Sequence, residues 1–169
     1  EMAESSLIDC WLEKAKVLIN PNNLPAYLRR VFTEHEQWVV TGGKKGQRGT
    51  LAEENLGYID LTKRDLSGII LKGCNLDGAD LSRCSLLFAD LTKSSLVDAN
   101  MTGAALSGAK LMGADLSRAD LTNALLTPIP VRGSDGVETG RVRMTDLRRA
   151  TLEAAILDGL DLTQCVTSH

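Results

Sequence analysis

The sequence predicts a mainly β fold, a solenoid whose chain winds into a closed coil, with a pair of α-helices at its N-terminal end. The coil is predicted by a large aliphatic residue that returns at every fifth position without a gap. A second observation is a usually small residue two positions before each of them, such as Ala79 or Ala119. A fixed short period of this kind is typical of repeat architectures. The periodic aliphatic residues are Leu61, Leu66, Leu71, Leu76, Leu81, Leu86, Leu91, Leu96, Met101, Leu106, Leu111, Leu116, Leu121 and Leu126.

A period of five fits neither a helix nor a straight strand. On an α-helix, five residues advance about 500°, so the leucines would rotate around the axis instead of forming a stripe. On a strand, an odd period would place successive leucines on opposite faces. The small residue and the leucine are two positions apart and share a face, but the next small residue is three positions further on. A corner must therefore lie between repeats, which gives a closed coil with one side per repeat.

The repeated motif A-(D/N)-L-x-x, as in Ala79-Asp80-Leu81 and Ala119-Asp120-Leu121, resembles the pentapeptide-repeat family. The resemblance covers residues 59–128 and resumes over residues 145–163. It implies a right-handed, four-sided (quadrilateral) β-helix in which about twenty residues form one coil. In that geometry the leucines form one interior ladder and the small residues form another.

The chain divides into two predicted parts, a helical cap or appendage with a Gly-rich linker over residues 1–49 and the β-helix over residues 50–169. Helical spacing of apolar residues predicts helices over residues 4–19 and 24–40. Because an open solenoid end exposes leucines and backbone groups, we expect the helices, or at least the second, to pack near Leu61 and Leu66. The alternative is that the first helix is a dimerisation element.

The Gly-rich residues 41–49 resemble a phosphate-binding loop only superficially, because the order of a phosphate-loop motif is missing and no strand precedes them. We interpret them as a flexible connector, with an anion-binding loop through Lys44, Lys45 and Arg48 as the alternative. His35-x-x-Trp38, followed by this stretch, is similar to the segment preceding the repeats in some proteobacterial pentapeptide-repeat proteins. A bacterial source is therefore expected.

The repeat is interrupted at about residues 127–142, where prolines and glycines give strong turn signals. We favour a loop excursion that turns at Ser134, Asp135 and Gly136. The alternative is a degenerate coil centred on Val131, Val137 and Val142. Loops that interrupt a regular scaffold often carry function, so this excursion is the best candidate for a partner contact.

Residues twenty apart should stack, so one outer column contains the candidate acidic ladder Asp60, Asp80, Asn100 and Asp120. Stacked carboxylates repel one another, and hydrogen bonds to adjacent turns are their expected structural role. The neighbouring Lys63 and Arg83 should reduce the negative field of this column.

The next column places apolar residues where most repeats have Ser, Thr or Gly. Leu87, Phe88 and Leu125 point outward there and form a candidate contact patch. The alternatives are scattered surface residues, or a seat for the 127–142 excursion or for an N-terminal helix.

Charge and composition exclude several classes of function. The net charge of −3 leaves no segment basic enough to argue for nucleic-acid or lipid binding. No apolar run is long enough for a membrane helix, and no signal peptide is found. Cys74, Cys84 and Cys165 occupy small inward positions and are expected to be reduced, as in a cytoplasmic protein. His35 lies on an apolar helical face and is interpreted as a packing residue.

The sequence contains no motif for a catalytic, cofactor-binding or metal-binding site. We therefore expect a non-enzymatic scaffold that presents faces and a loop for protein–protein interaction or self-association, including a homodimer. Some pentapeptide-repeat proteins mimic a DNA duplex and bind DNA gyrase, so a topoisomerase-directed DNA mimic is an alternative, and an accessory domain of a larger protein is another. The nearly balanced charge makes nucleic acid an unexpected partner.

Overall fold

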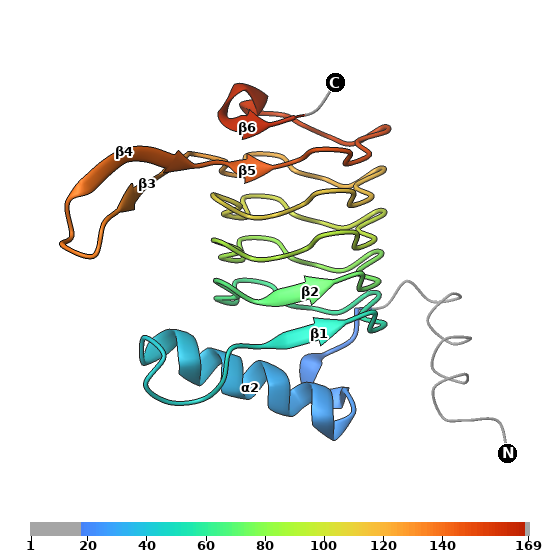
Figure 1. Cartoon of the computed structure of the whole chain (residues 1–169). Coiled ribbons are helices and arrows are strands. Elements are labelled where there is room, and N and C mark those ends of the chain that lie inside the picture. Colours follow the sequence, from blue (N-terminus) through green and yellow to red (C-terminus); the bar gives the residue numbers. More distant parts are fainter. Residues whose placement is uncertain (1–17, 168–169) are drawn as a thin grey trace, which may run out of the picture.

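The computed structural model describes residues 18–167 as a stack of coils with a helix across one end and a projecting β-hairpin near the other (Figure 1). The helix α2 spans Ala26–Val40, and the hairpin consists of β3, Ile129–Arg132, and β4, Glu138–Arg143. The other named elements are short: η1 (Pro21–Asn23), β1 (Thr50–Ala52), β2 (Ile70–Lys72), β5 (Thr145–Asp146), η2 (Leu162–Gln164) and β6 (Cys165–Val166).

Four parallel ladders of bridges hold the coils together, and in the regular region each joins residues twenty apart. One coil therefore contains four five-residue repeats. We name each ladder by its first full rung: the Thr50 ladder (Thr50, Ile70, Asp90, Lys110, Asp146, Val166), the Asn55 ladder (Asn55, Asn75, Ser95, Asp115, Thr151), the Asp60 ladder (Asp60, Asp80, Asn100, Asp120, Ile156) and the Asp65 ladder (Asp65, Ser85, Ala105, Leu125).

The repeats of the regular region share one backbone pattern, which Leu81 illustrates. Its amide donates to the carbonyl of Asn100 in the next coil, while the amide of Asp80 donates back to the carbonyl of Ile59. The turn that follows is closed by the amide of Cys84, which donates to the Leu81 carbonyl. Because the leucines and the small residues both point inward, they are almost completely buried from Leu56 to Leu121. This burial is the main stabilising contribution to the coil.

The corner residue, two positions after each leucine, has a positive φ and is often glycine. Several of these glycines lie against a large side chain one coil away. A methyl group on Gly78 would come 2.5 Å from Cε1 of Tyr58, and one on Gly108 would come 2.8 Å from Cδ1 of Phe88. At these two corners a glycine lies one coil away from a large side chain, which lets the coils approach one another.

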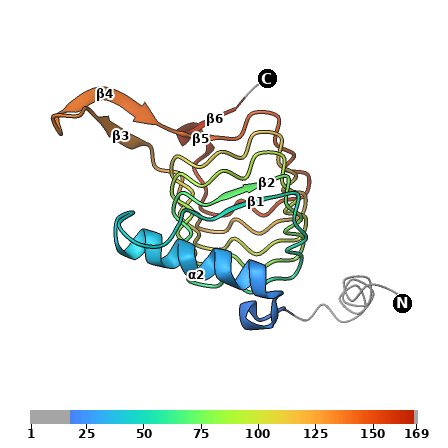
Figure 2. The same ribbon diagram turned by 60° about the horizontal axis from the view of Figure 1, so that its bottom comes forward.

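Helix α2 closes one end of the coil, as Figure 2 shows with that end brought forward. Leu28 and Phe32 of the helix are buried in the same apolar cluster as the first leucines of the coil, Leu61 and Leu66 among them. The expected packing of the second helix is therefore observed, with the helix beginning at Ala26 rather than at residue 24. The first predicted helix, over residues 4–19, falls almost entirely outside the described residues.

The connector after α2 is folded back on that helix. The amide of Gln47 donates to the carbonyl of Glu34, and the hydroxyl of Thr41 bonds to the backbone of Lys45. Arg48 donates from Nε to the carbonyl of Gly68 on the coil. These bonds hold residues 41–49, which we interpreted as a flexible connector, between the helix and the coil.

The interruption is an excursion and not a degenerate coil. Lys110 bridges to Asp146 and Asp115 bridges to Thr151, so the spacing jumps from 20 to 36 residues and returns to 20 afterwards. Sixteen residues therefore stand outside the coil. The alternative interpretation is wrong because Val131, Val137 and Val142, which it placed inside, are exposed.

Candidate functional site

The hairpin is the most exposed ordered feature of the described chain. Every residue of β4 is exposed, and Val137 retains 63% of its accessible surface. The predicted turn residues Ser134, Asp135 and Gly136 form its tip. There the amide of Gly136 donates to the Gly133 carbonyl, and Asp135 accepts from the amide of Val137. The tip is thus a defined turn whose side chains face solvent.

Phe88 anchors the base of the hairpin. Its ring lies 5.5 Å from the guanidinium carbon of Arg143 at the end of β4, within range of a cation–π interaction. On the coil side the ring lies over Gly108, where a methyl group would also come 3.2 Å from Cδ of Arg143. Among the sequence interpretations of Phe88, these contacts favour the seat for the excursion, although 37% of the side chain remains accessible.

Leu87 and Leu125 lie on the strip of the Asp65 ladder, beside the base of the hairpin. Leu87 is half-buried, whereas Leu125 is 56% exposed. The outward residues between them, Ala105 and Ser107, are uncharged. The structure therefore places Leu87 and Leu125 two coils apart on this strip, with no charged residue between them on it.

The residues of the candidate acidic ladder stack in one column. Their side chains accept hydrogen bonds from the turn that follows each of them. Oδ1 of Asp60 accepts from the amide and the hydroxyl of Thr62, and Oδ1 of Asp80 accepts from the amide of Ser82. Asn100 does the same with Thr102, and Asp120 accepts from the amide of Thr122. Hydrogen bonds from Thr62 and Thr122 hold the pKa values of Asp60 and Asp120 below their usual range. The expected structural role of this ladder is thus supported.

Sequence reasoning missed a charged cluster on the Thr50 ladder. Asp90 is only 6% exposed, and its carboxylate lies 3.4 Å from the ammonium of Lys72 and 3.6 Å from that of Lys110. Burial alone would raise the pKa of Asp90, but hydrogen bonds from Thr92 and the two ammonium groups hold it below its ordinary value. Asp90 and Lys110 are twenty residues apart in one column, and Lys72 lies two positions after Ile70 of the same column, so reading this whole face together would have found the cluster.

His35 is buried where α2 meets the coil. Its Nδ1 accepts a hydrogen bond from the amide of Gly49, and its ring stacks on Trp38. Burial lowers the pKa of His35, an effect that the nearby Leu66 carbonyl and Asp65 carboxylate oppose. Its Nε2 has no hydrogen-bond partner within residues 18–167. The histidine is thus a packing residue, as the sequence indicated, and it faces no open site.

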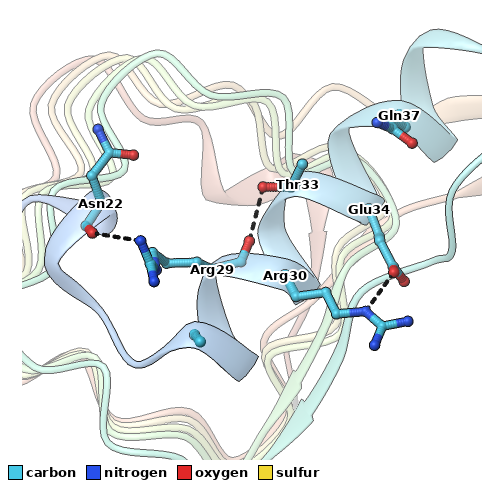
Figure 3. A pocket seen from close by; sticks show the side chains of 7 residues that line it. Asn22, Arg29, Arg30, Thr33, Glu34 and Gln37 are labelled. Atoms are coloured by element: carbon cyan, nitrogen blue, oxygen red, sulfur yellow. Dashed lines mark hydrogen bonds and ion pairs between the residues drawn. The ribbon is translucent and has the colours of Figure 1, made fainter.

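A surface depression of about 530 Å³ runs along the outer side of α2 (Figure 3). Its polar side chains already have partners: Arg30 pairs with Glu34, Arg29 donates to the Asn22 carbonyl, and Thr33 donates to the Arg29 carbonyl. It contains no nucleophile next to a base, so it offers no catalytic arrangement.

The described chain also shows no group of histidine, cysteine and carboxylate side chains that could hold a metal ion. The thiols of Cys74, Cys84 and Cys165 are free and buried, and burial raises the pKa of Cys84 to about 11. Within residues 18–167, no helix combines the length and apolarity needed to span a membrane.

A family model described as pentapeptide repeats matches residues 59–98 and 94–127, with 8 copies. Residues 59–127 are thus pentapeptide repeats, as the sequence predicted. Pentapeptide-repeat proteins fold as right-handed β-helices, which agrees with the mainly β coil and its one described α-helix.

Solved pentapeptide-repeat proteins are similar to this chain. Rfr23 from the cyanobacterium Cyanothece 51142 is 29% identical, with a TM-score of 0.48, and the match covers 70% of this chain and 66% of that one. HetL from Nostoc sp. strain PCC 7120, involved in heterocyst differentiation regulation, is 28% identical, with a TM-score of 0.37 and coverage of 72% and 56%. The plasmid-mediated fluoroquinolone resistance protein QnrB1 is 19% identical, with a TM-score of 0.28 and coverage of 76% and 70%. The chain thus spans less than two thirds of the length of the first two. No curated protein matches it.

Proposed function

We propose that this protein is a non-enzymatic scaffold whose coil presents the hairpin and the adjacent apolar strip to a protein partner. The observation that carries the proposal is the 16-residue excursion, which leaves an otherwise regular coil and exposes nearly all of its side chains. A two-stranded hairpin gains little stability in isolation, so exposed valines on it favour a role in contact. Leu87, Phe88 and Leu125 extend this surface onto the coil.

The finer parts of the proposal concern shape and setting. Four repeats in each 20-residue coil favour a four-sided cross-section, with the residues up to 49 as its helical cap. The free buried thiols fit a reducing compartment such as the bacterial cytoplasm. An interior filled by leucine and alanine leaves no space for a substrate, which supports the absence of enzymatic activity.

A DNA mimic directed at a topoisomerase is the alternative, and the acidic Asp60 ladder is the feature that favours it. Against it, the six rungs of the Thr50 ladder give a rod of only about 25 Å. An accessory domain of a larger protein is a second alternative, for which the same contact surface would serve.

The proposal is tested by removing residues 128–143, a deletion that the repeat itself dictates. It joins Thr127 to Met144 and leaves Leu147 five positions after Leu126, so the period is restored. Replacing Met144 by glycine in the same variant supplies the positive φ of a corner residue. Proteins that bind the whole chain should not bind this variant or the Leu125→Ser variant. Equal recovery of these proteins by all three forms would contradict the proposal. Inhibition of a topoisomerase by the whole chain that disappears in Asp80→Asn/Asp120→Asn would favour the DNA mimic.

A further inference from the structure

The net charge of the chain conceals a strong separation of charge on the folded molecule. The outward residues of the Thr50 ladder and the corner residues that follow them include five basic and three acidic side chains. The basic residues are Lys72, Lys93, Lys110, Arg148 and Arg149, and the acidic ones are Glu53, Asp90 and Asp146. This strip alone is net positive, at +2.

Two basic segments adjoin this strip at one edge. Residues 41–49 lead directly into β1, and the hairpin leads directly into β5. Because the strands of the ladder are parallel, both segments approach it from the edge where its strands begin. Figure 1 shows the two segments on the same side of the coil, one beside the end of α2 and the other beside β5.

We call the strip of the Thr50 ladder, residues 41–49 and the hairpin 129–143 the cationic surface. It carries eleven basic and five acidic residues, a formal charge of +6. The other described residues carry six basic and thirteen acidic side chains, a formal charge of −7. A molecule that appears nearly neutral is therefore divided into a positive surface and a negative remainder, which orients it in any encounter with a charged partner.

Part of the positive charge is unpaired. Within residues 18–167, the ammonium groups of Lys44, Lys45 and Lys93 and the guanidinium of Arg141 have no carboxylate or hydrogen-bond partner. Apolar side chains lie among these cations: Ile70 and Met112 are half-buried on the strip, and Val131, Val137 and Val142 are exposed on the hairpin.

We propose that the cationic surface binds an acidic segment of a partner protein in which apolar side chains alternate with the carboxylates. The proposal rests on the scaffold function above and specifies the chemistry of its partner. Carboxylates complement the unpaired cations and set the orientation, while apolar side chains cover the exposed valines.

Two other occupants fit less well. A nucleic-acid backbone could pair its phosphates with the cations, but it has no apolar side chains to cover the exposed Val131, Val137 and Val142. A second copy would have to offer acidic side chains of its own, such as those beside the Asn55 ladder, which include Asp77 and Asp98. Both of these carboxylates already have partners. Asp98 forms a two-pronged ion pair with Arg118, and Asp77 accepts from the hydroxyl of Ser95 and the amide of Val97.

Lys93 and Lys63 form a matched pair for the test. Both are exposed lysines at the corner position, with φ values of 59° and 61°, but only Lys93 belongs to the cationic surface. Lys93→Glu and Lys63→Glu change the net charge by the same amount, and both place glutamate at a position with a positive φ. Arg141→Glu tests the hairpin arm, and thermal unfolding confirms that each variant is folded.

The experiment is fluorescence anisotropy with three labelled probes: a peptide that alternates glutamate with leucine, a polyglutamate peptide and a DNA duplex of about 20 base pairs. The Glu–Leu peptide should bind most tightly and weaken as salt is raised. We expect Lys93→Glu and Arg141→Glu each to weaken it about fivefold or more and Lys63→Glu less than about twofold.

Equal effects of Lys93→Glu and Lys63→Glu, or tighter binding of the duplex, would overturn the inference. So would a failure of both acidic peptides to bind, or salt-sensitive self-association that Lys93→Glu abolishes. If the peptides fail while hairpin deletion still abolishes association with a partner, the scaffold function stands and only the acidic character of the partner is wrong.

Discussion

The regular coil and the hairpin differ in the interactions that hold them in place. In the coil, each repeat is held by backbone bonds to the coils before and after it and by a buried leucine. Among the described residues, β3 and β4 form backbone hydrogen bonds only with each other, and the ring of Phe88 on the coil lies beneath Arg143. The comparison indicates that the coil provides the stability of this protein while the hairpin is free to serve contact.

The largest expected effect is in the coil. Leu91→Asp places a carboxylate in the closed interior, where neither water nor a partner can compensate for it, so we expect the variant not to fold. Leu91→Ala should lower the free energy of unfolding by about 3–5 kcal/mol. Val137→Asp is the control on the hairpin and should change it by less than about 0.5 kcal/mol. Thermal unfolding followed by circular dichroism measures all three, and comparable losses at the two sites would contradict the distinction.

Close packing between coils should give the next largest effect. Gly78→Ala brings a methyl group within 2.5 Å of Tyr58, at a residue whose φ is 64°, and should cost about 2–3 kcal/mol. Gly113→Ala has nearly the same φ but meets only Cγ of Lys93 at 3.6 Å, so it should cost about 1 kcal/mol. Tyr58→Ala should rescue part of the loss in Gly78→Ala, and the absence of rescue would show that the packing contact is not responsible.

The Asp90 cluster should make part of the coil's stability depend on pH. The pKa of Asp90 is lower in the folded protein than in the unfolded chain, so its stabilising effect is present above the unfolded value of about 4 and is lost as the pH falls through the folded value. Asp90→Asn should cost about 1–2 kcal/mol at pH 7. Denaturant unfolding at pH 7 and at acid pH measures the difference, which should shrink toward low pH. A difference that is independent of pH would show that charge pairing is not the cause.

The smallest global effect is expected where the two regions meet. Phe88→Ala removes the ring beneath Arg143 and should destabilise the whole protein by about 1 kcal/mol or less. Its main effect should be faster amide hydrogen exchange in β4, while Phe88→Tyr, which keeps the ring, should exchange as the unchanged protein does. Unchanged exchange in Phe88→Ala would mean that another contact holds the hairpin.

The interior of the fold was predictable because one rule sets it. The period of five and the small residue before each leucine identified the buried residues, including the cysteines. The excursion was predictable in outline, but the spacing of 21 residues between Leu126 and Leu147 resembles a slightly long coil. The bridges from Lys110 to Asp146 and from Asp115 to Thr151, together with the exposed valines of the hairpin, separate the two interpretations.

The candidate surface was less predictable, because it depends on contacts between coils and on the path of the hairpin. In the sequence, Phe88 was interpreted as an exposed apolar residue. Its ring lies between Gly108 and Arg143, a position that depends on contacts among three separate segments of the chain. A count of charge along the chain gave a nearly balanced result, because each 20-residue coil contributes residues to all four ladders. A linear count therefore mixes residues that lie on different faces of the coil. The acidic ladder was found because its four members share one column.

The most direct test of the central claim, that the hairpin is an insertion carried by a continuous coil, is amide hydrogen exchange in the variant lacking residues 128–143. The amides of Leu111, Leu116 and Leu121 donate to the carbonyls of Asp146, Thr151 and Ile156 across the insertion. If the coil is continuous, these amides should remain as protected in the variant as in the whole chain. Loss of their protection while Leu81 and Leu86 stay protected would show that the hairpin is part of the structure that joins the coils, and would contradict the account.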